Sequence, residues 1–183
     1  MRIYLSIDLD YWKTGRRPEQ FLNRVKALRK PIKVTEEHHD LLSHMNSFSY
    51  DCLINIDWHS DLCENIPDFP ILKDGTWANH IRAGNRNQFI WIYPSYSCVE
   101  GRDNSSSTGY CNALGKYNPF LVRDPLKVCG WNRVNKRKRF ITEEEMSQVI
   151  GVGICLSPAY TSQYTLDRAK EHLKKLELFE KAA

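Results

Sequence analysis

Long hydrophobic runs are absent from this sequence of 183 residues. No apolar stretch approaches the roughly 20 residues that a membrane-spanning helix needs, and the N-terminal residues lead directly into an expected strand instead of a signal peptide. Internal repeats and heptads are absent as well. Because a chain of this length is too short for two ordinary domains, we expect one cytoplasmic domain over residues 1–183, with no membrane partner.

Paired cysteine motifs are also absent, although the chain contains six cysteines. No CxxC pair occurs, and several cysteines lie inside apolar runs, where a thiol packs as a small hydrophobic group. We therefore expect buried free thiols instead of disulfides, and no cysteine in a metal site. The cysteines are Cys52, Cys63, Cys98, Cys111, Cys129 and Cys155.

A strong excess of charge is missing too. The formal net charge is +4, and the balance of 42% hydrophobic and 26% charged residues is typical of a folded globular domain. Much of the positive charge lies in residues 133–139, Arg-Val-Asn-Lys-Arg-Lys-Arg. Such a cluster can bind phosphates, but a solvated loop before a helix explains so short a run more simply, so nucleic acid is a disfavoured partner.

Apolar runs alternate with segments of helical periodicity along the N-terminal part of the chain. This alternation is typical of a parallel sheet with helices on its faces. We therefore predict an α/β fold of three layers, α/β/α, with a mainly parallel sheet. The expected strands cover residues 3–10, 31–36, 52–56, 88–93 and 151–157, and the first two helices cover residues 18–28 and 39–45.

The remaining segments carry helix-start and loop signals. Thr142 and Glu145 form a capping-box pattern, and Thr165 is expected to cap the last helix, which has one apolar stripe. Residues 62–80 have no clear period and are expected to form a long loop that shapes a substrate pocket. Residues 95–118 are expected to include a flap.

Three metal-binding side chains stand at alternate positions directly after the apolar run 52–56. They are Asp57, His59 and Asp61, and residues two apart at a strand end lie on one face, so the three groups converge. Two further runs end in acceptor-rich clusters, at residues 8–10 and 36–39. Because strand ends in an open α/β sheet share one crevice, the three clusters together can hold two divalent ions.

The types of ligand indicate the metal and the chemistry. Carboxylate oxygen combined with imidazole nitrogen suits hard to borderline ions such as manganese. Two ions roughly 3.5 to 4 Å apart can share a bridging carboxylate and a water of lowered pKa, which favours hydrolysis. A single such motif is equally well explained as a capped strand end, but burying this many like charges without cations is strongly unfavourable.

The motifs resemble those of a known group. Residues 57–61 resemble the DxHxD motif of the arginase and deacetylase superfamily, and residues 6–10 resemble its SxDxD motif. Residues 36–38 stand where that superfamily has an acid followed by a ligating histidine. Together with Trp77 and the later runs Phe-Ile-Trp-Ile-x-Pro and Ile-Cys-Leu-Ser-Pro, the pattern is similar to the peptide arginase family. This resemblance implies an arginase-like, manganese-dependent hydrolase that converts arginine in a peptide to ornithine and urea.

Six side chains form the ligand set that the resemblance implies, and two of them bridge a pair of Mn²⁺ ions. The bridging residues are Asp57 and Asp8. The remaining ligands are His38 and Asp61 for one ion, and His59 and Asp10 for the other. His39 remains a rival of His38, since both stand at the expected junction of strand and helix.

The implied reaction also needs a group that protonates the departing amine. His80, on the loop after the metal motif, is the candidate shuttle, although an ordinary surface histidine fits that position equally well. Glu37 is a candidate catalytic acid that pairs with the cationic substrate. The other candidates for this pairing are Glu36, Glu64, Asp68 and Asp74.

The order of the motifs departs from the superfamily, where SxDxD follows DxHxD. A rearranged connection preserves the sheet if residues 151–157 lie beside the N-terminal strand; otherwise the N-terminal motif is a coincidence and the second ion is lost. Two alternative functions remain open. One is a metal-dependent amide hydrolase such as a deacetylase, and the other is a non-catalytic module that binds peptide or nucleic acid on the same fold.

Overall fold

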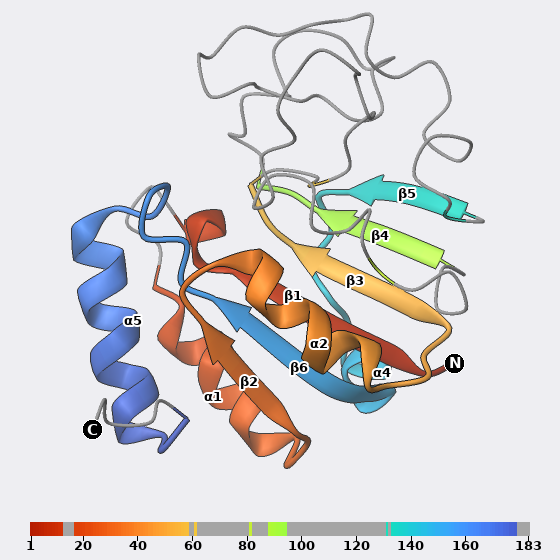
Figure 1. Ribbon diagram of the computed structural model, residues 1–183, viewed down its shortest axis with the longest axis horizontal. Helices are drawn as coiled ribbons and strands as arrows, with labels where there is room; N and C mark the ends of the chain where they lie inside the picture. Colours follow the sequence, from red (N-terminus) through yellow and green to blue (C-terminus); the bar gives the residue numbers. More distant parts are fainter. Residues whose placement is uncertain are drawn as a thin grey trace, which may run out of the picture.

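In the part of the chain that the structure describes, six strands lie side by side in one sheet, in the order β2-β6-β1-β3-β4-β5, and every neighbouring pair is parallel. Figure 1 shows this sheet with its flanking helices, in a computed structural model. The α/β class and the parallel sheet predicted from the sequence are confirmed. The structure describes residues 1–12, 17–58, 61, 81, 88–94, 131 and 133–178.

The elements alternate along the chain as the apolar pattern predicts. The strands are β1 (Ile3–Asp8), β2 (Ile32–Thr35), β3 (Cys52–Ile56), β4 (Gln88–Ile92), β5 (Arg133–Arg137) and β6 (Val149–Cys155). The α-helices are α1 (Glu19–Ala27), α2 (Leu42–Asn46), α4 (Glu143–Ser147) and α5 (Gln163–Lys175), and the short 3₁₀ helices are η1 (Leu9–Trp12) and η2 (His38–Leu41).

The centre of the sheet is buried on both faces. Every residue of β1 and β3 is buried, as is typical of parallel strands that helices cover on either side. Ile7 on β1 belongs to a core cluster with residues of α1 and α5, whereas Tyr4 belongs to a second cluster with Leu41 and Met45 of η2 and α2. Because odd and even side chains of a strand point to opposite faces, the two clusters lie on opposite sides of the sheet.

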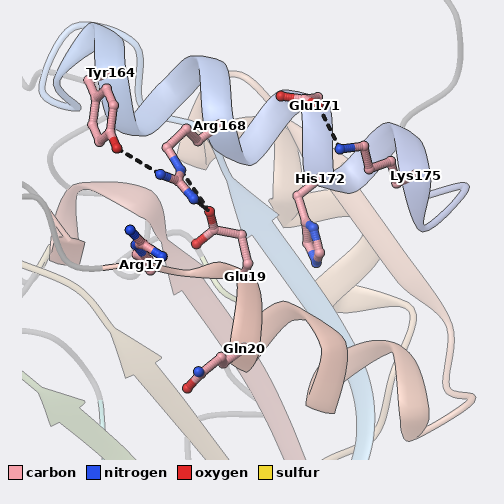
Figure 2. A pocket seen from close by; sticks show the side chains of 8 residues that line it. All are labelled: Arg17, Glu19, Gln20, Tyr164, Arg168, Glu171, His172 and Lys175. Atoms are coloured by element: carbon pink, nitrogen blue, oxygen red, sulfur yellow. Dashed lines mark hydrogen bonds and ion pairs between the residues drawn. The ribbon is translucent and has the colours of Figure 1, made fainter.

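A polar seam joins the first helix of the chain to the last. Arg168 on α5 donates hydrogen bonds of 2.7 Å to Glu19 Oε1 on α1 and to the Tyr164 hydroxyl. Figure 2 shows these side chains in a groove between the two helices, where Lys175 pairs with Glu171 on the same helix. Water screens ion pairs at such exposed positions, so the seam orients α5 more than it stabilises the fold.

The two predicted helix caps have different outcomes. Thr142 caps α4 in a full capping box, because its hydroxyl accepts from the Glu145 N–H and the Glu145 carboxylate accepts from the Thr142 N–H. The prediction for the last helix is wrong by three positions: Ser162 is the N-cap of α5, and the backbone N–H of Thr165 donates to Ser162 Oγ at 3.3 Å. Thr165 is buried and lies in the first turn of the helix.

The basic segment is not the solvated loop that its composition predicts. Residues Arg133–Arg137 form β5, which pairs in parallel with β4 along the full length of that strand. Arg137 donates two hydrogen bonds of 2.7 Å to the carboxylate of Glu145 on α4. Pairing with β4 satisfies the backbone hydrogen bonds on one side of β5, and the bidentate pair with Glu145 neutralises the guanidinium of Arg137. A charged segment can therefore occupy the edge position among the described strands.

Several expectations fall on residues that lie outside the described part of the chain. They are the loop at residues 62–80, the flap at residues 95–118 and four of the cysteines. Cys52 and Cys155, which are described, are buried free thiols as predicted. Among the described residues, no helix combines the length and the apolar character that crossing a membrane requires.

Two glycines allow the layer of η2 and α2 to approach β6 closely. A Cβ at Gly153 would lie 2.8 Å from Leu41 Cδ1 and 2.9 Å from the Tyr4 hydroxyl. A Cβ at Gly151 would meet the ring of Phe48 at 2.9 Å. Leu41 ends the helix η2 that begins at His38, so this close packing sets how near that helix comes to the strand ends.

We predict that Gly153→Ala lowers the free energy of unfolding by about 1 to 3 kcal/mol, because the added methyl group overpacks a filled space. Urea denaturation of the variant and the wild type measures this difference. The exposed Ser147→Ala serves as the control and is expected to stay within about 0.5 kcal/mol of wild type. Equal stability of Gly153→Ala and wild type would contradict the close packing.

Candidate metal centre

The carboxyl ends of three central strands meet at one point of the sheet. From β1 the chain crosses to β2 on one side and then returns to β3 on the other side, so the strand order reverses at β1. In open α/β sheets a crevice opens outside the strand ends at such a reversal. Asp8 is paired in register with Cys155, and Ile7 with Ile56, so Asp57 follows the strand next to Asp8.

Acidic, imidazole and thiol groups gather at this point in three overlapping groups. Within each group, the candidate ligand atoms all lie within 4.8 Å of one another, and every member is buried. The first group is Asp8, His38 and Cys155; the second is His38, Asp57 and Asp61; the third is Asp8, Asp10 and Asp57. The structure therefore brings together the five predicted ligands that it describes, which are Asp8, Asp10, His38, Asp57 and Asp61.

His38 lies at the centre of the cluster and its rival does not. Its Nδ1 atom is 3.1 Å from an Asp8 oxygen, 3.2 Å from an Asp61 oxygen and 3.7 Å from an Asp57 oxygen. His39 Nε2 instead lies 3.4 Å from Asp40, and the His39 side chain is 37% exposed. Because consecutive residues of a 3₁₀ helix point about 120° apart, only one of the two histidines can face the strand ends.

Hydroxyl and amide groups orient these side chains. Ser6 Oγ lies 3.0 Å from His38 Nε2, which leaves Nδ1 to face the carboxylates. The Ser157 hydroxyl donates to Asp8 Oδ2 at 2.5 Å, and the Asn55 side-chain amide donates to Asp57 Oδ2 at 3.0 Å. Such outer contacts fix the direction of metal-binding side chains.

Backbone geometry at the site is unusual in two places. Asp61 has φ 54° and Ser157 has φ 44°, both in the left-handed region that residues with a side chain seldom occupy. Each such conformation costs about 1 to 3 kcal/mol and persists where the surrounding structure enforces it. At Ser157 it accompanies the hydrogen bond to Asp8, and Asp61 is a member of the second group.

Burial makes the carboxyl groups difficult to ionise. Burial and then the charge of Asp10 raise the pKa of Asp8 from 3.8 to about 6, although interactions with His38 oppose the change. Burial and the charges of Asp61, Asp10 and Asp8 raise the pKa of Asp57 well above its ordinary value. The cluster therefore concentrates negative charge that water cannot solvate.

One imidazolium is the only cation facing this charge among the described residues of the cluster. Burial alone would lower the pKa of His38, but hydrogen bonds to Asp61 and Asp8 outweigh burial and raise the pKa from 6.5 to about 10. A protonated His38 thus stands where a cation is required. The donor set of carboxylate oxygens and imidazole nitrogen fits divalent ions such as Mn²⁺, which would neutralise more charge than one proton can.

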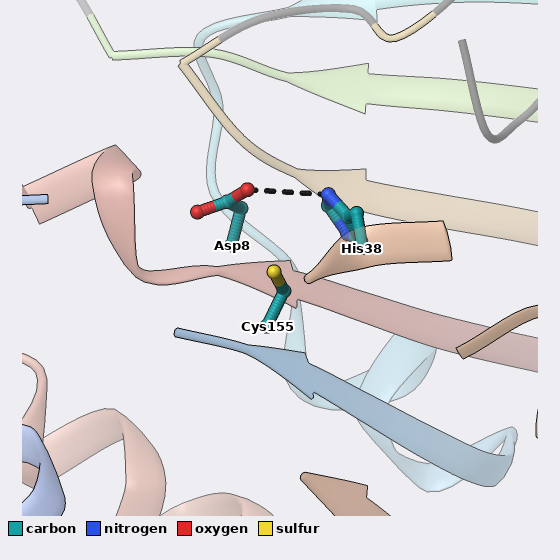
Figure 3. A group of neighbouring side chains, drawn as sticks. All are labelled: Asp8, His38 and Cys155. Carbon is teal, nitrogen blue, oxygen red and sulfur yellow. Dashed lines mark ion pairs between the residues drawn. The ribbon is translucent and has the colours of Figure 1, made fainter. Parts of the chain in front are cut away.

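Cys155, which we expected to take no part in the site, belongs to one of the three groups. Figure 3 shows Asp8, His38 and Cys155 extending toward one another from β1, η2 and β6. The sequence carries a signal for this placement: the rearranged connection requires residues 151–157 to lie beside β1, and β6 does lie there. Pairing Asp8 with Cys155 in a parallel register puts their side chains on the same face.

The other predicted residues stand apart from the cluster or outside the described residues. Glu37 is half-buried before η2 and belongs to none of the three groups, and Glu36 is exposed and pairs with Lys170 on α5 at 3.1 Å. The predicted residues that lie outside the described part of the chain are His59, Glu64, Asp68, Asp74 and His80.

Comparisons of this chain with protein-family models, with curated proteins and with solved structures found no match. The interpretation of the cluster therefore depends on its own geometry and on the residues that form it.

Metal-free protein is expected to lose stability as the pH rises. Native Asp8 keeps its proton up to a pH of about 6, whereas the unfolded chain releases it near 3.8. Native His38 keeps its proton up to a pH of about 10, whereas the unfolded chain releases it near 6.5. In both windows the native state binds more protons than the unfolded state, so the free energy of unfolding falls with increasing pH.

Urea denaturation in the presence of a chelator, from a pH of about 4 to about 9, measures this decline. The variant Asp57→Asn removes one of the carboxyl groups with a raised pKa and is expected to show a shallower decline. Metal-free stability that increases across the whole range would contradict the described electrostatics.

Proposed function

We propose that this protein is a hydrolase with two Mn²⁺ ions that acts on the guanidinium group of arginine in a peptide and releases urea, leaving ornithine. The observation that carries the proposal is the overlap of the three buried groups: Asp8, His38 and Asp57 each belong to two of them. Shared ligands are what a binuclear centre requires, because ions roughly 3.5 to 4 Å apart are held by common carboxylates.

An arginase-like three-layer architecture is part of the proposal, and the parallel sheet flanked by helices supports it.

The proposed ligand roles follow from the membership of the groups. Asp8 and Asp57 are the bridging carboxylates, since they occur together with Asp10 in one group and separately with His38 in the other two. Asp61 completes the position at His38, and His59 of the DxHxD motif is proposed to complete the position at Asp10. The hydrogen bonds from Ser157 and Asn55 would hold one oxygen of each bridging carboxylate.

The candidate ligands are buried, so the chain's own residues would hold the reacting groups away from bulk water. When bound, the two ions lower the pKa of water so that hydroxide is available near neutral pH, and they stabilise the charge that develops during attack. His80 is proposed to deliver the proton that the departing amine takes up when its C–N bond breaks, and Glu37 to pair with the guanidinium. The resemblance of residues 6–10 and 57–61 to the peptide arginase family is what selects a guanidinium over an amide.

We predict that Asp57→Asn abolishes urea release from an arginine-containing peptide, because it removes a bridging carboxylate. Colorimetric urea measurement on manganese-loaded protein tests this. The control is Asp40→Asn, which changes an exposed carboxylate outside the cluster and is expected to retain wild-type activity. Equal urea release from wild type and Asp57→Asn would contradict the proposal. Release of a free amine and an acid instead of urea would indicate the amide hydrolase.

The neighbouring histidines provide a matched test of metal binding. His38→Ala is expected to lose about tenfold or more in manganese affinity, because the buried imidazole would be a ligand. His39→Ala is expected to bind manganese as the wild type does, since its side chain faces Asp40. Isothermal titration calorimetry and metal content per chain give both values. Equal loss in the two variants would contradict the ligand assignment.

A further inference from the structure

We infer that Cys155 is a metal ligand, so that the position at His38 and Asp8 combines thiolate, imidazole and carboxylate. This inference rests on the metal centre proposed above and not on the guanidinium reaction. It makes the two metal positions chemically different: one includes sulfur, whereas the group of Asp8, Asp10 and Asp57, which His59 is proposed to complete, includes none.

The geometry supports a site that can close on an ion. The Cys155 sulfur, a ring nitrogen of His38 and a carboxylate oxygen of Asp8 all lie within 4.8 Å of one another. In a tetrahedral zinc site with metal–sulfur and metal–nitrogen distances of about 2.3 and 2.0 Å, the ligand atoms lie roughly 3.3 to 3.8 Å apart. Movements of about 1 Å therefore bring the three side chains onto one ion, without a change in strand pairing.

The present partners of the thiol are compatible with this change. Cys155 Sγ lies 3.3 Å from the backbone oxygen of Glu36 and 3.1 Å from the Ser157 hydroxyl. On metal binding the thiol would release its proton to solvent and form the bond through sulfur, giving up the weak hydrogen bond to Glu36. Ser157 touches both Asp8 and Cys155, so one hydroxyl would support two ligands of the same ion.

The other described cysteine has none of these features. Cys52 is equally buried, but it lies at the start of β3, at the amino ends of the strands, whereas the cluster lies at their carboxyl ends, and it belongs to none of the three groups. Burial raises the pKa of the Cys52 thiol to about 12, so without a metal beside it the thiol stays protonated near neutral pH. Cys52 is therefore a packing residue and a matched control for Cys155.

A thiolate changes which ion the position prefers. Soft sulfur ligands favour zinc, iron and cobalt over manganese, whereas carboxylates alone suit manganese. We expect the position at Cys155 to select zinc, iron or cobalt when these compete with manganese. The other position, where Asp10 and the proposed ligand His59 offer oxygen and nitrogen but no sulfur, is expected to retain manganese, so the protein as isolated can contain two different metals.

Absorption spectroscopy of the full-length protein with Co²⁺ tests the inference directly. Wild type is expected to show a thiolate-to-cobalt charge-transfer band in the near ultraviolet, and Cys155→Ser is expected to lose it. Cys52→Ser should retain the band. Cys155→Ser is also expected to lose about tenfold or more in zinc affinity, about 1.4 kcal/mol, with a smaller loss for manganese.

The outcomes separate this inference from the proposed centre. Cobalt binding without a thiolate band, or with the same band in Cys155→Ser, overturns the role of Cys155 and leaves the carboxylate and histidine centre intact. No binding of any divalent ion overturns both. If Cys155→Ser and Cys155→Ala both fail to fold, X-ray absorption of zinc-loaded wild type decides: a sulfur neighbour at about 2.3 Å supports the inference, and oxygen and nitrogen neighbours alone overturn it.

Discussion

Three carboxylates, those of Asp8, Asp57 and Asp61, lie within 3.7 Å of the Nδ1 atom of one buried imidazole, that of His38. Water cannot solvate charge at this depth, so each carboxylate must be protonated, paired or bound to a cation. The raised pKa values of Asp8 and Asp57 and the raised pKa of His38 are consequences of that one constraint. A pair of divalent ions would relieve it more fully than one proton on an imidazole does.

The sheet determines which groups face this problem together. With β6 inserted between β1 and β2, the end of β1 has a strand on each side, and both of these strands contribute polar groups. Ser157 donates to the Asp8 carboxylate and Asn55 to the Asp57 carboxylate, and left-handed backbone at Ser157 and Asp61 accompanies the arrangement. Free energy stored at these positions is offset by the apolar packing of β1 and β3, which are buried throughout.

Local sequence patterns predicted the helices and strands well where a pattern has a single physical explanation. The apolar run that predicts β3 matches the observed strand, and the capping box at Thr142 is present as its side chains require. The prediction that Thr165 caps the last helix was wrong because Ser162, one turn earlier, has a hydroxyl that can cap the helix equally well. The prediction of a solvated loop at residues 133–139 was wrong because it used only the charge of the segment. The pairing with β4 depends on a strand more than forty residues away in the sequence.

The α/β class, the parallel sheet and the clusters of acids and histidines at the strand ends could be predicted from the order of the amino acids, because alternation and residue type are local properties. The direction of the two histidine side chains and the neighbours of each strand depend on tertiary structure, which no local pattern predicts. It turned His38 inward and His39 outward, since neighbouring residues of a helical turn cannot face the same way. It also set Cys155 beside Asp8, because the register between β1 and β6 joins residues that stand at opposite ends of the chain.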